Sequence, residues 1–128
     1  MAKAAFTPAL NTEYERLFNS CIISPKNLSI VEKLDEQLLG NTARYESVGD
    51  TLGIPWFFIA VIHNMEASQN FKAQLHNGDP LTARTVQIPA GRPKKGKPPF
   101  TWEESATDAL AMRGLGAKTD WSLSGLLY

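Results

Sequence analysis

The sequence lacks an excess of charge of either sign, because 13 lysines and arginines balance 13 aspartates and glutamates in 128 residues. Proteins that bind nucleic acid or an anionic membrane surface usually carry a clear basic excess. The composition therefore argues against both kinds of partner. With 43% hydrophobic residues the chain can bury a core of its own, and we expect a single domain over residues 1–128.

Cysteine and histidine are also scarce. The single cysteine, Cys21, excludes an intrachain disulfide framework, and its place beside two isoleucines predicts a buried structural thiol. The two histidines, His63 and His76, are separated by a predicted hairpin strand, and the sequence has no recognised metal-ligand spacing. We therefore expect neither a metal nor another cofactor.

Long apolar runs are absent as well. The most apolar stretch, Ile54–Ile62, is far shorter than the roughly 20 residues that cross a bilayer. The N-terminal segment Met1–Pro8 has no apolar core after Lys3 and does not resemble a secretory signal. We therefore expect a cytoplasmic protein that is not inserted into a membrane.

Helical periodicity dominates the sequence outside residues 68–100. Two capping-box patterns mark helix starts, Thr12 with Glu15 and Thr101 with Glu104. The predicted helices lie near 12–21, from Pro25 toward Val48 with a break at Gly40, from Pro55 to Met65, from Thr101 to Arg113 before Gly114, and from Thr119 or Asp120 to the end. The third of these carries no permanent charge before its last turn, so we expect other elements to surround it on most sides.

Residues 68–100 have a different character. Asn77-Gly78 is the dipeptide that supplies positive φ angles in tight hairpin turns, so we expect a small β-hairpin directly after the apolar helix. Five of the eight prolines fall between Pro80 and Pro99, and the segment 91–99 is typical of an exposed loop. The predicted fold class is therefore mainly α, a helical domain with a small β-hairpin.

Glu66 is the most informative single residue, because it ends the nearly uncharged helix. Desolvation and the negative end of the helix dipole both disfavour an ionised carboxylate at such a position. A carboxyl group that keeps its proton near neutral pH is what general-acid cleavage of a glycosidic bond requires. The alternative is a glutamate that simply ends the helix in solvent. His63, three residues earlier, either contacts this carboxyl group or is a core histidine.

The segment around Glu66 resembles a known motif. Ala60–Ser68 is similar to the helix end of soluble lytic transglycosylases and goose-type lysozymes, in which a Glu-Ser pair follows an apolar helix and the glutamate is the catalytic acid. Here Ala67 separates the glutamate from Ser68. The longer stretch Leu52–Leu110 resembles a bacterial and phage-associated family of lysozyme-like proteins. The resemblance implies a lysozyme-like fold and cleavage of the sugar backbone of peptidoglycan.

A second motif of these enzymes is similar to Thr85–Ala90, although Arg84 and Thr85 stand where glycines are usual. The resemblance implies that Gln87 contacts the substrate in the cleft. The other candidate substrate-binding residues are Ser68, His76, Thr85 and Trp102. Trp102 is included because an aromatic face suits a sugar ring, although aromatic side chains more often fill cores.

A second carboxylate would distinguish the mechanisms, since retaining and inverting hydrolases both use two acids. Asp79 is the candidate, because phage-type lysozymes place an aspartate at a similar hairpin. The sequence Asn77–Pro80 is equally typical of a plain turn. By resemblance, lytic transglycosylases need only the glutamate, because the 6-hydroxyl of the substrate attacks the anomeric carbon.

Three functions follow as expectations: a muramidase or lytic transglycosylase acting on peptidoglycan with Glu66 as its acid, a glycosidase acting on chitin or chitosan, and a non-catalytic wall-binding protein. The basic tract Arg92–Lys97 is either a contact for an anionic wall or a solvated loop. The chain ends within an apolar-faced helix, where similar sequences continue to a Tyr-Asn-Gly motif. We therefore expect apolar surface that promotes self-association or pairing with another chain.

Overall fold

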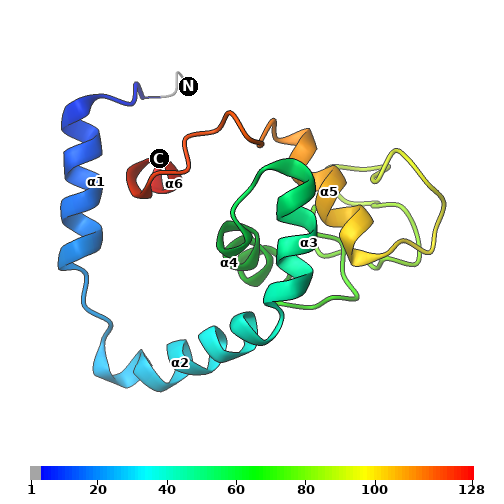
Figure 1. Ribbon diagram of the computed structural model, residues 1–128. Helices are drawn as coiled ribbons and strands as arrows, with labels where there is room; N and C mark the ends of the chain where they lie inside the picture. Colours follow the sequence, from blue (N-terminus) through cyan, green and yellow to red (C-terminus); the bar gives the residue numbers. More distant parts are fainter. Residues whose placement is uncertain (1–3) are drawn as a thin grey trace. The chain divides into compact units, whose positions relative to one another are not determined.

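The computed structural model describes residues 4–128 and is mainly helical, as the periodicity predicts (Figure 1). The helices are α1 (Pro8–Ser20), α2 (Pro25–Gly40), α3 (Thr42–Leu52), α4 (Trp56–Ala67), α5 (Trp102–Met112) and α6 (Leu123–Leu127). The chain divides into two compact units. One comprises residues up to Asp35 together with Thr119–Tyr128, and the other comprises Glu36–Lys118. Among residues 4–128, no helix combines the length and apolar character that a bilayer crossing requires.

Side-chain caps explain where several helices begin. The prediction of a capping box at Thr12 is wrong, because Thr7 caps α1 instead and Pro8 occupies its first turn. The capping box of α5 is confirmed, with Thr101 and Glu104 exchanging side-chain and backbone hydrogen bonds at 3.1 and 2.7 Å. The last helix is capped by Ser122 rather than by either residue predicted. The starts of α1, α5 and α6 are therefore fixed locally, by one side-chain oxygen each.

In the first unit, α6 lies against α1. The rings of Phe6 and Tyr128 are 4.8 Å apart, and the Tyr128 hydroxyl donates a hydrogen bond to the carbonyl of Ala4. The expectation of a buried thiol is wrong, because Cys21 is exposed. It lies just after the end of α1, and the next residue, Ile22, is 88% exposed, so this apolar run does not join a core.

The second unit contains the larger core, which α3, α4 and α5 build together (Figure 1). Its centre is an aromatic cluster of Tyr45, His63, Phe71 and Trp102, whose neighbouring ring centroids lie 4.6–5.8 Å apart. The Arg44 guanidinium lies 4.0 Å from the centre of the Phe71 ring and covers one side of the cluster. Tilted and edge-on ring contacts of this kind stabilise a core beyond the area that they bury.

Helix α4 presents three stripes of side chains with different surroundings. One stripe is buried and consists of Ile59, Ala60 and His63. A second stripe lines a pocket and consists of Phe58, Ile62 and Glu66. The third is exposed to solvent and consists of Phe57, Val61 and Met65. The expectation that α4 is surrounded on most sides is therefore wrong. The apolar composition of α4 supplies both a core face and a pocket wall, and it leaves a third apolar face in solvent.

The expected β-hairpin is reduced to a turn. Only one bridge pair, Ala73 with Pro80, forms among residues 4–128. Gly78 has a φ of +82°, but Asn77 does not adopt a positive φ, so this is not the turn that joins two hairpin strands. Proline at position 80 donates no backbone hydrogen bond, and the proline-rich segment after it does not extend the pairing.

The α5 capping box generates a stability prediction. Replacing Thr101 by alanine should lower the free energy of unfolding by about 1 kcal/mol, because the Glu104 amide loses its acceptor while α5 still has to pack into the core. Thr101→Ser should retain most of this stability, because serine keeps the hydroxyl. Urea denaturation of both variants measures the difference. Equal stabilities for the alanine variant and the unchanged protein would contradict the assigned cap.

Candidate active site

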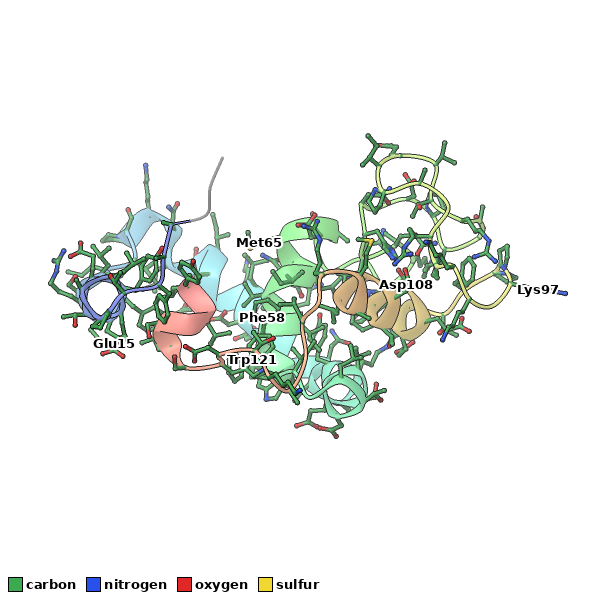
Figure 2. All side chains as sticks on the ribbon, turned by 90° about the horizontal axis from the view of Figure 1, so that it is seen from above. Glu15, Phe58, Met65, Lys97, Asp108 and Trp121 are labelled. Carbon is green, nitrogen blue, oxygen red and sulfur yellow. The ribbon has the colours of Figure 1, made fainter. Side chains whose placement is uncertain are left out.

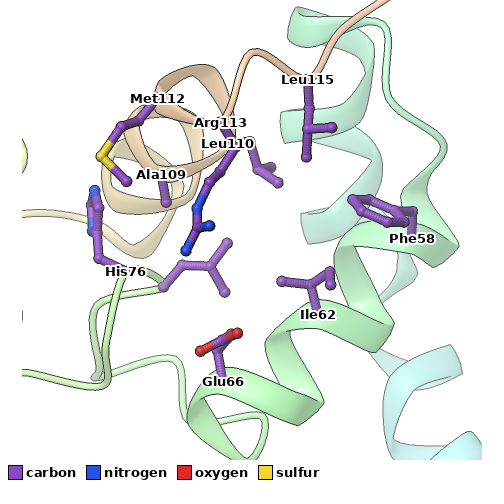
Figure 3. A pocket seen from close by; sticks show the side chains of 10 residues that line it. Phe58, Ile62, Glu66, His76, Ala109, Leu110, Met112, Arg113 and Leu115 are labelled. Atoms are coloured by element: carbon purple, nitrogen blue, oxygen red, sulfur yellow. The ribbon is translucent and has the colours of Figure 1, made fainter. Parts of the chain in front are cut away.

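The second unit contains a pocket of about 270 Å³ beside the C-terminal end of α4. Three of its lining residues are polar or charged: Glu66 from α4, His76 from the turn and Arg113 from the end of α5 (Figure 3). The remaining walls are apolar, formed by Phe58, Ile62, Leu75, Ala109, Leu110, Met112 and Leu115. We refer to this cavity as the Glu66 pocket.

The Glu66 side chain extends from the last turn of α4 into the pocket (Figure 3). Within residues 4–128 its carboxylate makes no side-chain hydrogen bond and no ion pair, so both oxygens are available to a ligand. The residue as a whole is exposed rather than buried. The desolvation expected from the sequence is therefore not provided by the protein alone.

His63 does not contact Glu66, although it lies three residues before it. Its ring is fully buried in the aromatic cluster, where Nδ1 is 2.9 Å from the Tyr45 hydroxyl. Burial lowers the pKa of His63 and raises that of Tyr45 to about 12, so both groups are uncharged at neutral pH. The Tyr45 hydroxyl then donates to the neutral imidazole. This confirms the alternative of a core histidine.

His76 lines the Glu66 pocket, and a network of buried polar side chains holds its ring in place. Its Nε2 lies 2.7 Å from Oδ2 of Asp108, and the same oxygen is 2.9 Å from Nε of Arg92. Its Nδ1 is 3.4 Å from the Ser105 hydroxyl, which also accepts a hydrogen bond from the Leu75 amide. Burial lowers the pKa of His76, although Asp108 opposes this effect. Both ring nitrogens have partners, so His76 mainly forms a fixed wall of the pocket.

Asp79 organises the turn that follows α4. Its Oδ2 accepts hydrogen bonds from the amides of Val86 and Gln87 at 2.8 and 3.1 Å, and from the Asn77 side chain at 3.1 Å. These donors hold the pKa of Asp79 below its ordinary value. The turn lies against α4, since a Cβ added to Gly78 would be 3.7 Å from the carbonyl oxygen of Glu66. Asp79 is thus near the end of α4, but its oxygen is engaged by the protein.

The segment that resembles the second motif is a short, closed loop. Thr85 is 3% exposed, and its hydroxyl both donates to the Pro89 carbonyl and accepts from the Arg92 amide. This hydroxyl holds the loop together and does not face a ligand, which corrects its assignment as a substrate contact. Gln87 is exposed, and its carbonyl accepts a hydrogen bond from the Asn77 side chain. The Gln87 backbone therefore lies beside the turn that contacts the end of α4, and Gln87 does not line the Glu66 pocket.

Two other candidates lie outside the pocket. Trp102 is 1% exposed and belongs to the aromatic cluster, so its ring cannot stack on a sugar, and that assignment is wrong. The aromatic ring that suited a sugar instead packs against Tyr45, His63 and Phe71 in the core. Ser68 is exposed at the C-cap of α4 with a φ of +50°, and it does not line the pocket. Its position two residues after Glu66 does not bring it to the same cavity.

The basic tract divides between the interior and the solvent. Arg92 turns inward to Asp108, whereas Lys97 extends away from the ribbon at the outer end of the loop (Figure 2). Lys94 and Lys95 line a second cavity of about 590 Å³ against α3 and α5. The tract is therefore not one continuous cationic surface. Among residues 4–128, no three histidine, cysteine, aspartate or glutamate side chains are grouped so that they could hold a metal ion.

Comparison with models of protein families, with curated proteins and with solved structures finds no match.

Sequence reasoning missed Asp108 and Arg113. Asp108 contacts partners far away in the sequence, so no local pattern indicates its role. Arg113 could be predicted only as the end of a helix before Gly114, because its entry into the pocket depends on how α3 places α4 and α5.

The Asp79 network predicts a pH-dependent loop. Because its folded pKa is depressed, the stabilisation exists above the ordinary aspartate pKa and is lost as the pH falls through the lower folded value. Asp79→Asn should speed hydrogen exchange of the Val86 and Gln87 amides at neutral pH, since the ionised acceptor is lost. Exchange should approach the variant's rate when the unchanged protein is acidified through that range.

The matched control is Asp50→Asn, which removes an exposed aspartate on α3. It should leave exchange of both amides unchanged. Equal protection of these amides in the Asp79 variant and the unchanged protein would show that the carboxylate does not hold the loop.

Proposed function

We propose that the chain cleaves the sugar backbone of peptidoglycan, with Glu66 protonating the oxygen of the leaving sugar, and that it is a lysozyme-like protein. The observation that carries this proposal is the unpaired Glu66 carboxylate inside a largely apolar pocket. A general acid needs a position within reach of the glycosidic oxygen and no competing partner in the protein. Apolar walls also exclude water once a sugar fills the cavity.

The surroundings of Asp79 favour a mechanism with one carboxylate. Its Oδ2 already accepts three hydrogen bonds, and its main task is to hold the loop at Val86 and Gln87. A nucleophile or base needs an oxygen aimed at the substrate, whereas the bonds to Oδ2 fix the orientation of this carboxylate, and Asp79 does not line the Glu66 pocket. We therefore favour the lytic transglycosylase reaction over hydrolysis with two acids.

In this reaction the proton of Glu66 moves to the glycosidic oxygen as the bond from that oxygen to the anomeric carbon breaks. The carboxylate so formed then accepts the proton of the substrate's own 6-hydroxyl, whose oxygen bonds to the same anomeric carbon. Glu66 ends protonated, and the products are a shortened glycan and a 1,6-anhydro sugar end. One residue thus serves as acid and then as base. His76, with both ring nitrogens engaged, shapes the pocket without exchanging protons.

Replacement of Glu66 by glutamine tests the proposal. Turnover of purified peptidoglycan should fall at least about 10²-fold, because glutamine fills the same space but carries no transferable proton. Thermal unfolding should change little, since the side chain makes no bond to the protein. Chromatography of released fragments measures the turnover, and mass spectrometry identifies a 1,6-anhydro end against a reducing end.

Glu46→Gln is the matched control, because it removes an exposed glutamate on α3, outside the pocket lining. It should keep full activity. Equal turnover in the Glu66 and Glu46 variants would remove Glu66 from the mechanism. If the unchanged protein binds peptidoglycan and releases no fragments, the chain is a wall-binding protein instead.

A further inference from the structure

Arg113 contributes a second charge to the Glu66 pocket. It is the C-cap residue of α5, and its guanidinium extends from that helix end into the cavity toward the side where Glu66 lies (Figure 3). The residue makes no side-chain hydrogen bond and no ion pair within residues 4–128. Arginine presents five N–H donors in a planar fork that matches a carboxylate. An unpaired guanidinium facing a cavity is therefore equipped to bind an anionic group.

The other charges around the cavity compensate one another. Arg92 lies behind the His76 wall, and its charge is balanced by Asp108 at 2.9 Å. Burial keeps His76 uncharged at neutral pH. Among the lining residues, Arg113 is therefore the one cation and Glu66 the one carboxylate, and the two form no ion pair.

The apolar walls of the pocket strengthen the attraction between Arg113 and an anionic ligand. Leu110 and Leu115, which lie close to Arg113 in sequence, line the same cavity together with Phe58 and Ile62. When a bound sugar displaces water from these apolar surfaces, the local dielectric falls and the attraction between a guanidinium and an anion grows. A cationic group placed there would be repelled, and a neutral one would leave the guanidinium desolvated without an ionic partner.

We propose that Arg113 binds a carboxylate of the substrate and thereby makes the pocket selective for an acidic glycan over neutral or cationic ones. This inference rests on the proposed function and narrows it. Of the polymers considered, peptidoglycan carries carboxylates, on its stem peptides and on those lactyl groups from which the peptide has been removed, whereas chitin is neutral and chitosan is cationic. The positive charge of Arg113 thus distinguishes the three polymers. Arg113 acts here as a specificity-determining residue, whereas Glu66 carries the proton.

Binding can be measured without cleavage in protein that carries Glu66→Gln. The probes are peptide-free peptidoglycan strands with free lactyl carboxylates, a chitin hexamer and a chitosan hexamer, each titrated by calorimetry. Adding Arg113→Gln should weaken binding of the acidic strands at least about tenfold, the usual effect of losing a charge-assisted hydrogen bond. Binding of the chitin hexamer should stay within about twofold, and the chitosan hexamer should bind more tightly after the change.

Two further variants control the result. Arg113→Lys keeps the charge without the planar fork and should restore part of the affinity for the acidic strands. Lys118→Gln removes an exposed positive charge outside the pocket lining and should change nothing. Circular dichroism and thermal unfolding verify that each variant folds. Equal affinity of the Arg113→Gln and Arg113→Lys proteins for the acidic strands would overturn the proposal, as would a parallel loss for all three probes.

The outcomes for the two proposals are separable. Glu66-dependent cleavage that is indifferent to Arg113 on every polymer would overturn the selectivity and leave the proposed function standing. Arg113-dependent binding of acidic strands without any cleavage would overturn the enzymatic function and support the ligand assignment. Absence of binding to all three probes by the Glu66→Gln protein would refute both.

Discussion

The orientation of α4 about its own axis decides which of its side chains face the Glu66 pocket. A buried hydrogen bond helps to hold this orientation. The Tyr45 hydroxyl lies 2.9 Å from Nδ1 of His63 inside the aromatic cluster. Burial keeps both groups uncharged, so the bond is neutral and strong in a low dielectric. With His63 held inward, the stripe ending at Glu66 turns toward the pocket. This bond acts together with the buried side chains of Ile59 and Ala60, which lie on the same face of α4.

A second buried contact connects the opposite wall. Oδ2 of Asp108 on α5 meets both His76 from the turn and Arg92 from the long loop. A chain segment with little regular structure is thereby attached at two points to a helix that is itself anchored in the core. Within the same segment, the Asp79 carboxylate accepts hydrogen bonds from the amides of Val86 and Gln87 and so holds the loop together. Carboxylates replace the strand pairing that the hairpin would have supplied, which explains how an irregular loop can hold a defined pocket wall.

Local sequence patterns predicted the features that depend only on neighbouring residues. They failed for features that depend on contacts between residues far apart in the sequence. The α5 capping box needs only Thr101 and Glu104, so it could be predicted. Thr12 carries the same pattern but is displaced as a cap by Thr7, because Pro8 suits the first turn of a helix better. Glu66 could be placed at a helix end, but its exposure and the entry of Arg113 into the same cavity depend on how α4 and α5 each pack against α3. No spacing in the sequence encodes that packing.

The pocket also shows why a balanced composition is a weak guide to the charge of a site. The chain has no net charge, yet one carboxylate and one guanidinium face a single apolar cavity without pairing within 4 Å. The desolvation penalty for these two charged groups is smallest while water still fills the cavity. As a ligand displaces that water, each group needs a polar partner from the ligand to offset the penalty. A ligand that supplies an anion to Arg113 and a proton acceptor to Glu66 satisfies both demands in one binding event. The exposure of Glu66 in the free protein is therefore compatible with a catalytic role, because the bound polymer completes the desolvation that the protein leaves unfinished.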